Sequence, residues 1–360
     1  MHYSPRTPTG PDDFHLLKII GKGGFGKVFQ VRGKLCEKIY AMKVVDIPEH
    51  EKEQEHLRTE IKVLKSVKSP FLCKMSYCFE TKQQVFIILD FMHGGEMFRL
   101  LNRKGCLTET DAKFYAAELV LALGHLHENE VIYRDLKMEN VLIDKHGHVK
   151  LADFGLSKCN IAKGKTTNSF CGTYETMAPE IILRQDYGHG VDVWALGCLI
   201  HDMIVGGSPF AGETNDEIVD NIMNKPLKLL DFSKECRNLL LLMLKRRVNS
   251  RIEIEKIKEH AFFNGVNWDS VSAQSTLPPF KPKISSDDDV SYFDPAYTDL
   301  PAMMSPSKVQ STRSADNIDN TTSFINFEYK EAYGKESKVS EVLEADSSPK
   351  QNNPKRRRQK

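Results

Sequence analysis

The sequence predicts an α+β fold, with a small β-rich N-terminal lobe at about residues 14–91 and a larger helical C-terminal lobe at about residues 92–263. Short apolar and β-branched runs dominate the first region, and helical spacing of apolar residues dominates the second. After residue 263 the share of Pro, Ser and Asp rises, which marks a boundary. The 360 residues, 40% of them hydrophobic, are enough to bury a large core.

The N-terminal lobe is expected to contain strands and one helix. Leu57, Ile61 and Leu64 fall on one face of a predicted helix over residues 51–65. The leader, residues 1–13, is rich in Pro, Thr and Gly, and we expect it to be flexible. The predicted strands are residues 14–20, 28–31, 39–45 and 85–91.

Helices dominate the predicted C-terminal lobe. Thr108 and Asp111 resemble a capping box. The segment after them, residues 114–126, is apolar on more than one face and is expected to be buried. Two short strands are predicted at residues 141–143 and 149–151, and further helices at residues 193–205, 215–223 and 236–244.

The rest of the chain reads as a regulatory tail, residues 264–330, and a disordered basic end, residues 331–360. Aromatic residues in the tail suggest that it docks back onto the body. The basic run Lys355–Arg358 fits a nuclear import signal, an anionic-surface patch or a solvated terminus. We therefore expect a cytoplasmic protein that can also enter the nucleus.

Composition excludes several classes of protein. A net charge of +1 argues against a generic nucleic-acid binder, and we expect no specific nucleic-acid partner. The eight cysteines fit neither a disulfide scaffold nor a zinc-ligand spacing, so we expect reduced thiols in an intracellular protein. No secretory signal is visible, and no apolar run approaches the ~20 residues of a membrane-spanning helix.

A glycine-rich loop lies between the first two predicted strands. It reads G-x-G-x-x-G-x-V, and glycine lets the backbone approach phosphates closely. Dinucleotide-binding folds use a similar spacing before a helix, whereas this loop leads into a strand. The residues of this loop that we expect at a nucleotide are Gly21, Gly23, Gly24, Phe25, Gly26 and Val28.

Lys43 lies inside the next predicted strand, in Ala41-Met42-Lys43. A lysine within an apolar strand is unfavourable unless it is paired. Its expected partners are the ATP phosphates and Glu60 on the following helix; the alternative is a surface lysine on an edge strand.

The run from Tyr133 to Asn140 supplies three groups that phosphoryl transfer needs. Asp135 can orient a hydroxyl and accept its proton, and Lys137 places a cation near the moving phosphoryl group. Asn140 supplies an oxygen for magnesium, and Asp153 in Asp-Phe-Gly supplies a carboxylate for the same hard cation.

These motifs, followed by Ala178-Pro179-Glu180, resemble the eukaryotic protein kinase superfamily over about residues 14–263. The resemblance implies the bilobal kinase fold, ATP and Mg²⁺ as cofactors, and transfer of the γ-phosphate to Ser or Thr. It also implies a Glu180–Arg251 pair. The implied nucleotide-binding residues are Val28, Ala41 and Leu142 around the adenine, Leu89 as gatekeeper, Asp90 to Met92 as hinge, and Glu96.

Features of the activation segment resemble the AGC branch of these kinases. Tyr133 replaces the more usual His, and Ser169 in Ser-Phe-Cys-Gly-Thr matches the phosphorylated activation-loop position. A phosphate on Ser169 would pair with Arg134 and Lys158. The implied partner is an upstream activating kinase such as the phosphoinositide-dependent kinase, and the expected state is a monomer.

The tail carries further elements of that branch. Tyr292-Phe293-Asp294 resembles the element that reaches the ATP site, and Ser305 resembles a turn-motif phosphosite. The hydrophobic motif comprises Phe324, Phe327, Glu328 and Tyr329, and Glu328 occupies the position that is phosphorylated in relatives.

The glycine-rich loop and the segment after Asp153 are most similar to the ribosomal protein S-six kinase subfamily. The resemblance places Glu96, Glu139, Asp202 and Thr173 at the protein substrate. The alternative for each acid alone is an ordinary surface carboxylate, but together the three acids predict substrates with arginine upstream of the target residue.

Three residues depart from the family pattern. Met138 replaces Pro, which we expect to be tolerated, Thr176 replaces Tyr, and Val193 replaces Trp. Because of Thr176 and Val193, a catalytically weak, pseudokinase-like scaffold is a second interpretation. The acid at Glu328 keeps a kinase of the atypical protein kinase C-like subfamily as a further alternative.

Overall fold

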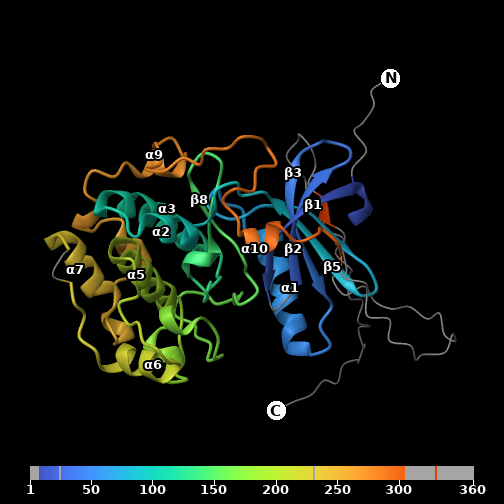
Figure 1. Cartoon of the computed structure of the whole chain (residues 1–360). Helices are drawn as coiled ribbons and strands as arrows, with labels where there is room; N and C mark the ends of the chain where they lie inside the picture. The colour runs from blue at the N-terminus through green and yellow to red at the C-terminus, as the bar shows by residue number, and fades with distance from the viewer. Residues whose placement is uncertain (1–7, 24–25, 230–231, 305–328, 331–360) are drawn as a thin grey trace, which may run out of the picture. The chain divides into compact units, whose positions relative to one another are not determined.

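The computed structural model describes residues 8–23, 26–229, 232–304 and 329–330. The chain divides into two units, Met1–Lys330 and Glu331–Lys360, and every described residue belongs to the first. The described part of the N-terminal lobe contains a six-stranded sheet in the order β1-β2-β3-β5-β4-β9 (Figure 1). Its strands are β1 (Phe14–Gly23), β2 (Gly26–Gly33), β3 (Ile39–Asp46), β4 (Met75–Glu80), β5 (Gln84–Asp90) and β9 (Tyr329–Lys330).

Helix α1 (Glu51–Ser66) is the main helix of this lobe. Glu51 and Glu53 lie in its first turn, where negative charge is favourable to the helix dipole. Leu57, Ile61 and Leu64 face the core, as the sequence predicts. Glu60 lies one turn after Leu57 and is therefore also on the buried face.

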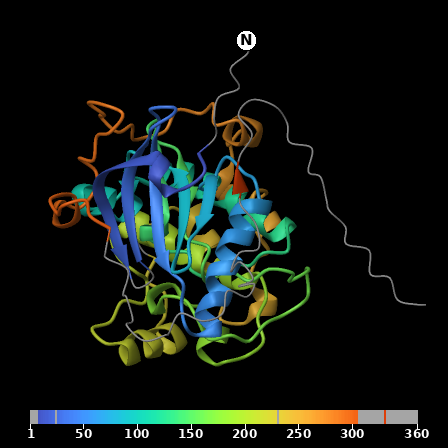
Figure 2. The same cartoon turned by 90° about the vertical axis from the view of Figure 1, so that its right-hand side faces the viewer.

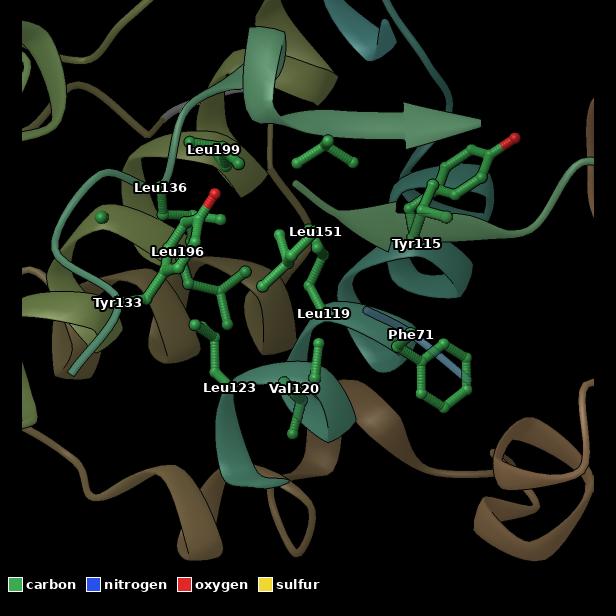
Figure 3. Packing of buried hydrophobic residues seen from close by; sticks show 14 of the residues in the cluster. Phe71, Tyr115, Leu119, Val120, Leu123, Tyr133, Leu136, Leu151, Leu196 and Leu199 are labelled. Atoms are coloured by element: carbon green, nitrogen blue, oxygen red, sulfur yellow. The ribbon is translucent and has the colours of Figure 1, made fainter. Parts of the chain in front are cut away.

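The C-terminal lobe is built around α3 (Glu109–Glu128) and α5 (Gly190–Val205). Thr108 caps α3 by accepting a hydrogen bond from Asp111 N, which is the N-cap half of the predicted capping box. Leu119 and Leu123 of α3 pack with Leu196 of α5 and Leu151 in the core (Figure 3). The other helices are α2 (Met97–Lys104), α4 (Pro179–Ile182), α6 (Asn215–Asn224), α7 (Lys234–Met243) and α8 (Ile254–Ile257).

A second sheet has the order β6-β7-β8, with β6 (Gly95–Glu96), β7 (Val141–Ile143) and β8 (Val149–Leu151). The two predicted runs at residues 141–143 and 149–151 are these last two strands, which pair antiparallel. Short 3-10 helices connect the other elements at Met138–Asn140, Tyr174–Thr176, Val248–Ser250 and Ala261–Phe263.

Structure continues beyond the composition boundary at residue 263. Val271 of α9 (Trp268–Ser272) lies in the main core. The tail then returns to the N-terminal lobe, where α10 (Pro295–Thr298) packs against β1 and Lys18 Nζ donates to Thr298 O. In Figure 2 this orange segment lies along the edge of the blue strands.

Several elements differ from the predictions. Sequence reasoning missed β4 and α2, although Met97, Leu100 and Leu101 of α2 have helical spacing and large apolar residues alternate along β4. The last part of the predicted leader is ordered, because Pro11–Asp13 form a 3-10 helix. All eight cysteines are free thiols, as predicted. Among the described residues, no helix has the length and hydropathy to cross a membrane.

Candidate active site

Lys43 on β3 links two carboxylates from distant parts of the chain. Its Nζ lies 2.6 Å from Glu60 Oε1 and 3.3 Å from Asp153 Oδ1. Burial by itself lowers the pKa of Lys43, but the charges of Glu60 and Asp153 outweigh it and raise the pKa. Burial likewise opposes ionisation of Asp153, and Lys43 lowers its pKa on balance. The predicted Lys43–Glu60 pair is confirmed.

The catalytic loop places Asp135 beside Lys137 and Thr173. Lys137 Nζ lies 2.9 Å from Asp135 Oδ2, and the Thr173 hydroxyl donates to Asp135 Oδ1 at 2.8 Å. Lys137 Nζ also donates to Thr173 Oγ1 at 3.1 Å. These contacts fix the orientation of the carboxylate that the sequence predicts as the proton acceptor.

Asp192 on α5 binds the backbone of the catalytic loop, a role that sequence reasoning missed. It is 1% exposed and accepts hydrogen bonds from Tyr133 N at 2.9 Å and Arg134 N at 2.8 Å. His127 Nε2 lies 2.8 Å from the same carboxylate. Arg134 has a φ of +68°, a conformation that needs such support in a non-glycine residue. An aspartate inside the apolar helix α5 was the available signal.

The residues predicted around the adenine lie together. Ala41 is buried with Phe91, and Val28 and Leu89 pack against them. Leu142 on β7 pairs with Glu96 on β6. Met92 is buried, and Asp90 forms ion pairs with Lys38, just before β3, and with Lys150 on β8 of the second sheet. Gly24 and Phe25 lie outside the described residues.

The donor atoms fit magnesium and ATP. Asn140 Nδ2 donates both to Asp135 O at 2.8 Å and to Asp135 Oδ2 at 2.9 Å, so the carbonyl oxygen of the Asn140 side chain is left to accept a cation. The Asp153 side chain is 44% exposed. An amide oxygen and a carboxylate suit a hard divalent ion. Gly26 has a φ of +144°, and a Cβ there would lie 2.0 Å from Val44 O, so the close approach to β3 requires glycine at this position.

The activation segment is held at Glu180, near its end, and at Ser169, within it. Arg251 Nη1 and Nη2 bind Glu180 Oε1 and Oε2 at 2.6 and 3.0 Å, which confirms the predicted pair. Tyr187 bridges Ser169 and Arg134, because its hydroxyl donates to Ser169 O at 2.6 Å and accepts from Arg134 Nη1 at 3.0 Å. Ser169 is thus one side chain away from the predicted phosphate ligand.

The second predicted phosphate ligand, Lys158, lies 3.2 Å from Glu55 Oε1 on α1. Sequence reasoning made no prediction for His56, the next residue on that helix, although it lies close enough to Arg134 for their charges to interact. Burial lowers the pKa of His56, and the positive charges of Lys52 and Arg134 lower it further. His56 precedes Glu60 by one helical turn, and this spacing was the sequence signal that could have placed the two residues on the same side of α1.

Glu139 acts on both other acids assigned to substrate. Burial raises the pKa of Glu96, the charge of Arg99 opposes this, and the charges of Glu139 and Asp294 add to the rise. Burial and the same Glu139 raise the pKa of Asp202 to about 6. Because ionised carboxylates repel each other, this region favours a ligand that brings positive charge.

Tail residues reach the hinge and α2. Phe293 stacks on Phe91 with ring centroids 5.3 Å apart, and Arg99 forms an ion pair with Asp294. Arg103 lies 5.0 Å from the centre of the Tyr292 ring. Ser305, Phe324, Phe327 and Glu328 lie outside the described residues.

The departures from the family pattern are accommodated by packing. Met138 and Val193 lie in the main core, at 4% and 2% exposure. The Thr176 hydroxyl donates to Thr173 O at 3.4 Å.

Comparison with known proteins agrees with this geometry. The model "Protein kinase domain" matches residues 14–263, and "Protein kinase C terminal domain" matches residues 284–329. Ribosomal protein S6 kinase beta of Caenorhabditis elegans is 44% identical over 90% of this chain, and the match spans 60% of that relative's length. Serine/threonine-protein kinase Sgk1 of Rattus norvegicus is 42% identical over 89% of this chain and 76% of its own length. The chain belongs to the protein kinase family, in the AGC branch of serine/threonine kinases.

Proposed function

We propose that this chain transfers the γ-phosphoryl group of ATP to serine or threonine in protein substrates, with Mg²⁺ as the metal. The observation that carries the proposal is the assembled Lys43–Glu60–Asp153 arrangement, with Nζ–O distances of 2.6 and 3.3 Å. A protein kinase needs the lysine–glutamate pair formed and the aspartate of Asp-Phe-Gly placed to bind magnesium.

The chain's own residues have distinct roles in this reaction. Asp135 orients the substrate hydroxyl and accepts its proton, and Lys137 stabilises the charge that develops on the phosphoryl oxygens. Asn140 and Asp153 would hold the metal, and Lys43 the α- and β-phosphates. When bound, ATP supplies the phosphoryl group and Mg²⁺ neutralises charge on its oxygens.

The test is phosphorylation of an Arg-rich serine peptide by the wild type and by Asp135→Ala. Loss of the proton acceptor should reduce the rate by ~10²–10⁴. If neither protein phosphorylated the peptide, even with Ser169 phosphorylated, the scaffold interpretation would be favoured instead.

The substrate preference proposed here is for arginine upstream of the phosphorylated residue. The mutual influence of Glu96, Glu139 and Asp202 supports it. Replacing the upstream arginines of the peptide by alanine should raise KM more than it lowers kcat, because the contacts act mainly on binding. In Glu139→Gln the two peptides should differ less.

Activation is proposed to require a phosphate on Ser169, added by an upstream kinase such as the phosphoinositide-dependent kinase. The Tyr187 bridge to Arg134 supports this, since a phosphate near Ser169 would have a guanidinium within reach. Ser169→Ala should stay at basal activity after treatment with that kinase. The matched control is Thr166→Ala, which changes an exposed hydroxyl of the same segment.

The tail is proposed to dock on the N-terminal lobe through its hydrophobic motif. The pairing of β9 with β4, where Tyr329 lies opposite Cys78, supports this placement. Glu328 would act as a fixed negative charge, although a phosphate carries about −1.5 to −2. Glu328→Ala should reduce activity; unchanged activity and unchanged tail docking would contradict the role of this charge.

Ser305 is proposed as a second phosphosite. The residue before it, Met304, lines a pocket together with Lys22 and Lys27, whose positive charges would attract a phosphate. When both proteins are phosphorylated in cells, Ser305→Ala should have a lower melting temperature than the wild type. When both are unphosphorylated, their melting temperatures should be the same.

For localisation, we propose entry into the nucleus through the basic residues Lys355–Arg358, which lie outside the described residues. Deleting residues 354–360 from a tagged protein should then abolish its nuclear signal. An unchanged nuclear signal would remove this proposal.

A further inference from the structure

The hairpin of β7 and β8 carries both proposed metal ligands at one end. Asn140 directly precedes β7, and Asp153 follows β8 after one intervening residue. Ala152 N donates to Asn140 O at 2.9 Å, which ties the two strands together between the ligands. Each strand has only three residues, so a displacement of the turn is transmitted to both ligands.

The opposite end of this hairpin is a turn fixed by two acids. Asp144 Oδ1 accepts hydrogen bonds from the backbone N–H groups of His146, Gly147 and His148 at 2.8–3.0 Å. Glu118 on α3 contacts the turn with both oxygens. Its Oε1 lies 2.6 Å from His148 Nδ1, and its Oε2 accepts from Val149 N at 2.8 Å.

This pair is buried between three parts of the molecule. Glu118 is 1% exposed and His148 is 6% exposed. The linker after α9 covers the turn, because a Cβ on Gly147 would lie 2.0 Å from Phe280 O. The backbone of Gln274, in the same linker, hydrogen-bonds His148. His148 therefore contacts α3, the hairpin and the tail linker at once.

Glu118 and His148 act on each other's protonation. Burial lowers the pKa of His148, but the hydrogen bond and charge of Glu118 outweigh it, and Asp144 adds to them, so the pKa is raised. Burial raises the pKa of Glu118, and the contacts with His148 and Val149 N offset this rise only in part. An imidazolium facing a carboxylate in a low-dielectric site is a strong and directional contact.

We propose that Glu118 and His148 are positioning residues for the magnesium site, holding Asn140 and Asp153 in place through the β7–β8 hairpin. The linker over Gly147 supports the same turn from the outside. This inference rests on the proposed function, because it needs Asn140 and Asp153 to bind magnesium. Residues that orient metal ligands commonly affect affinity by 10–100-fold when changed.

The experiment measures magnesium binding directly. Mg²⁺ is titrated by calorimetry into the full chain in the presence of a non-hydrolysable ATP analogue. His148→Gln and Glu118→Gln should each raise the apparent Kd for Mg²⁺ by about tenfold. His146→Gln makes the same change on an exposed residue of the same turn and should leave the Kd unchanged.

A pH series separates positioning from simple stability. Removing the Glu118 carboxylate takes away the main group that raises the pKa of His148, and burial then lowers that pKa. In Glu118→Gln the imidazole should therefore lose its proton at a lower pH than in the wild type, and Mg²⁺ affinity should weaken as it does so. The wild type should keep its affinity to a higher pH. Glu118→Gln retains an acceptor for Val149 N, so its Mg²⁺ affinity tests the positioning role even if His148→Gln does not fold.

Two outcomes have separate meanings. Unchanged Mg²⁺ affinity in both variants, even with a lower melting temperature, would overturn the positioning role. Failure of Asp153→Asn to reduce Mg²⁺ affinity would instead count against the proposed metal site itself, and with it the proposed function.

Discussion

Arg251 and Glu180, 71 positions apart in the sequence, form a buried bidentate ion pair in which the side chains are 1% and 2% exposed. Arg251 Nη1 also donates to Gly190 O at the start of α5. The pair therefore connects the end of the activation segment to the central helix of the C-terminal lobe. Breaking one side of such a pair leaves an uncompensated buried charge.

Arg251→Met should lower the free energy of unfolding by about 3–5 kcal/mol, because Glu180 would lose its partner in a buried site. Chemical denaturation monitored by fluorescence measures this change. The matched control is Lys163→Met, which removes an exposed pair with Glu253 and Glu255 and should leave the midpoint unchanged. Equal effects in the two variants would contradict the importance of burial here.

Glu60→Gln should reduce kcat/KM for ATP by up to about 10²-fold, since Lys43 would lose the contact that sets its position. The control is Glu55→Gln on the same helix, whose carboxylate is 62% exposed and pairs with Lys158. Steady-state kinetics with varied ATP measure both. A Glu60→Gln enzyme with wild-type kinetics would show that Lys43 is held adequately by Asp153.

Affinity for an Arg-rich peptide should fall as the pH is lowered from 7.5 to about 5.5. The pKa of Asp202 is raised to about 6, so its carboxylate is ionised above that pH and becomes neutral below it. A neutral acid attracts arginine less, so KM for the peptide should rise on acidification. Asp202→Asn should show a flatter profile; an equally steep one would assign the dependence to another group.

Phe293→Ala should raise KM for ATP about 2- to 10-fold, equivalent to the ~0.5–1.5 kcal/mol of an aromatic pair. Phe293 stacks on Phe91 and packs in the same cluster as Ala41 and Val28. Leu277→Ala serves as the tail control because Leu277 is 90% exposed. If KM for ATP were the same in both variants, the tail would have no part in shaping the nucleotide pocket.

Sequence alone determined the two-lobed α+β fold and most of the residues at the candidate site. Periodicity located α1 and α5, and the short runs that became β7 and β8 were predicted with the observed bounds. Lys43 and Asp135 were identifiable because their residue types and spacing match the needs of phosphoryl transfer. These are local signals, and a sequence carries local signals directly.

Tertiary structure alone decided which distant groups meet. No spacing shows that Asp192 holds the catalytic loop, that His56 lies near Arg134, or that His148 joins α3 to the tail linker. Such contacts depend on how helices and strands pack, and the pKa of a buried acid depends on the charges that packing brings near it. The family resemblance can identify an acid such as Asp202, but only the fold places it near Glu139 and raises its pKa.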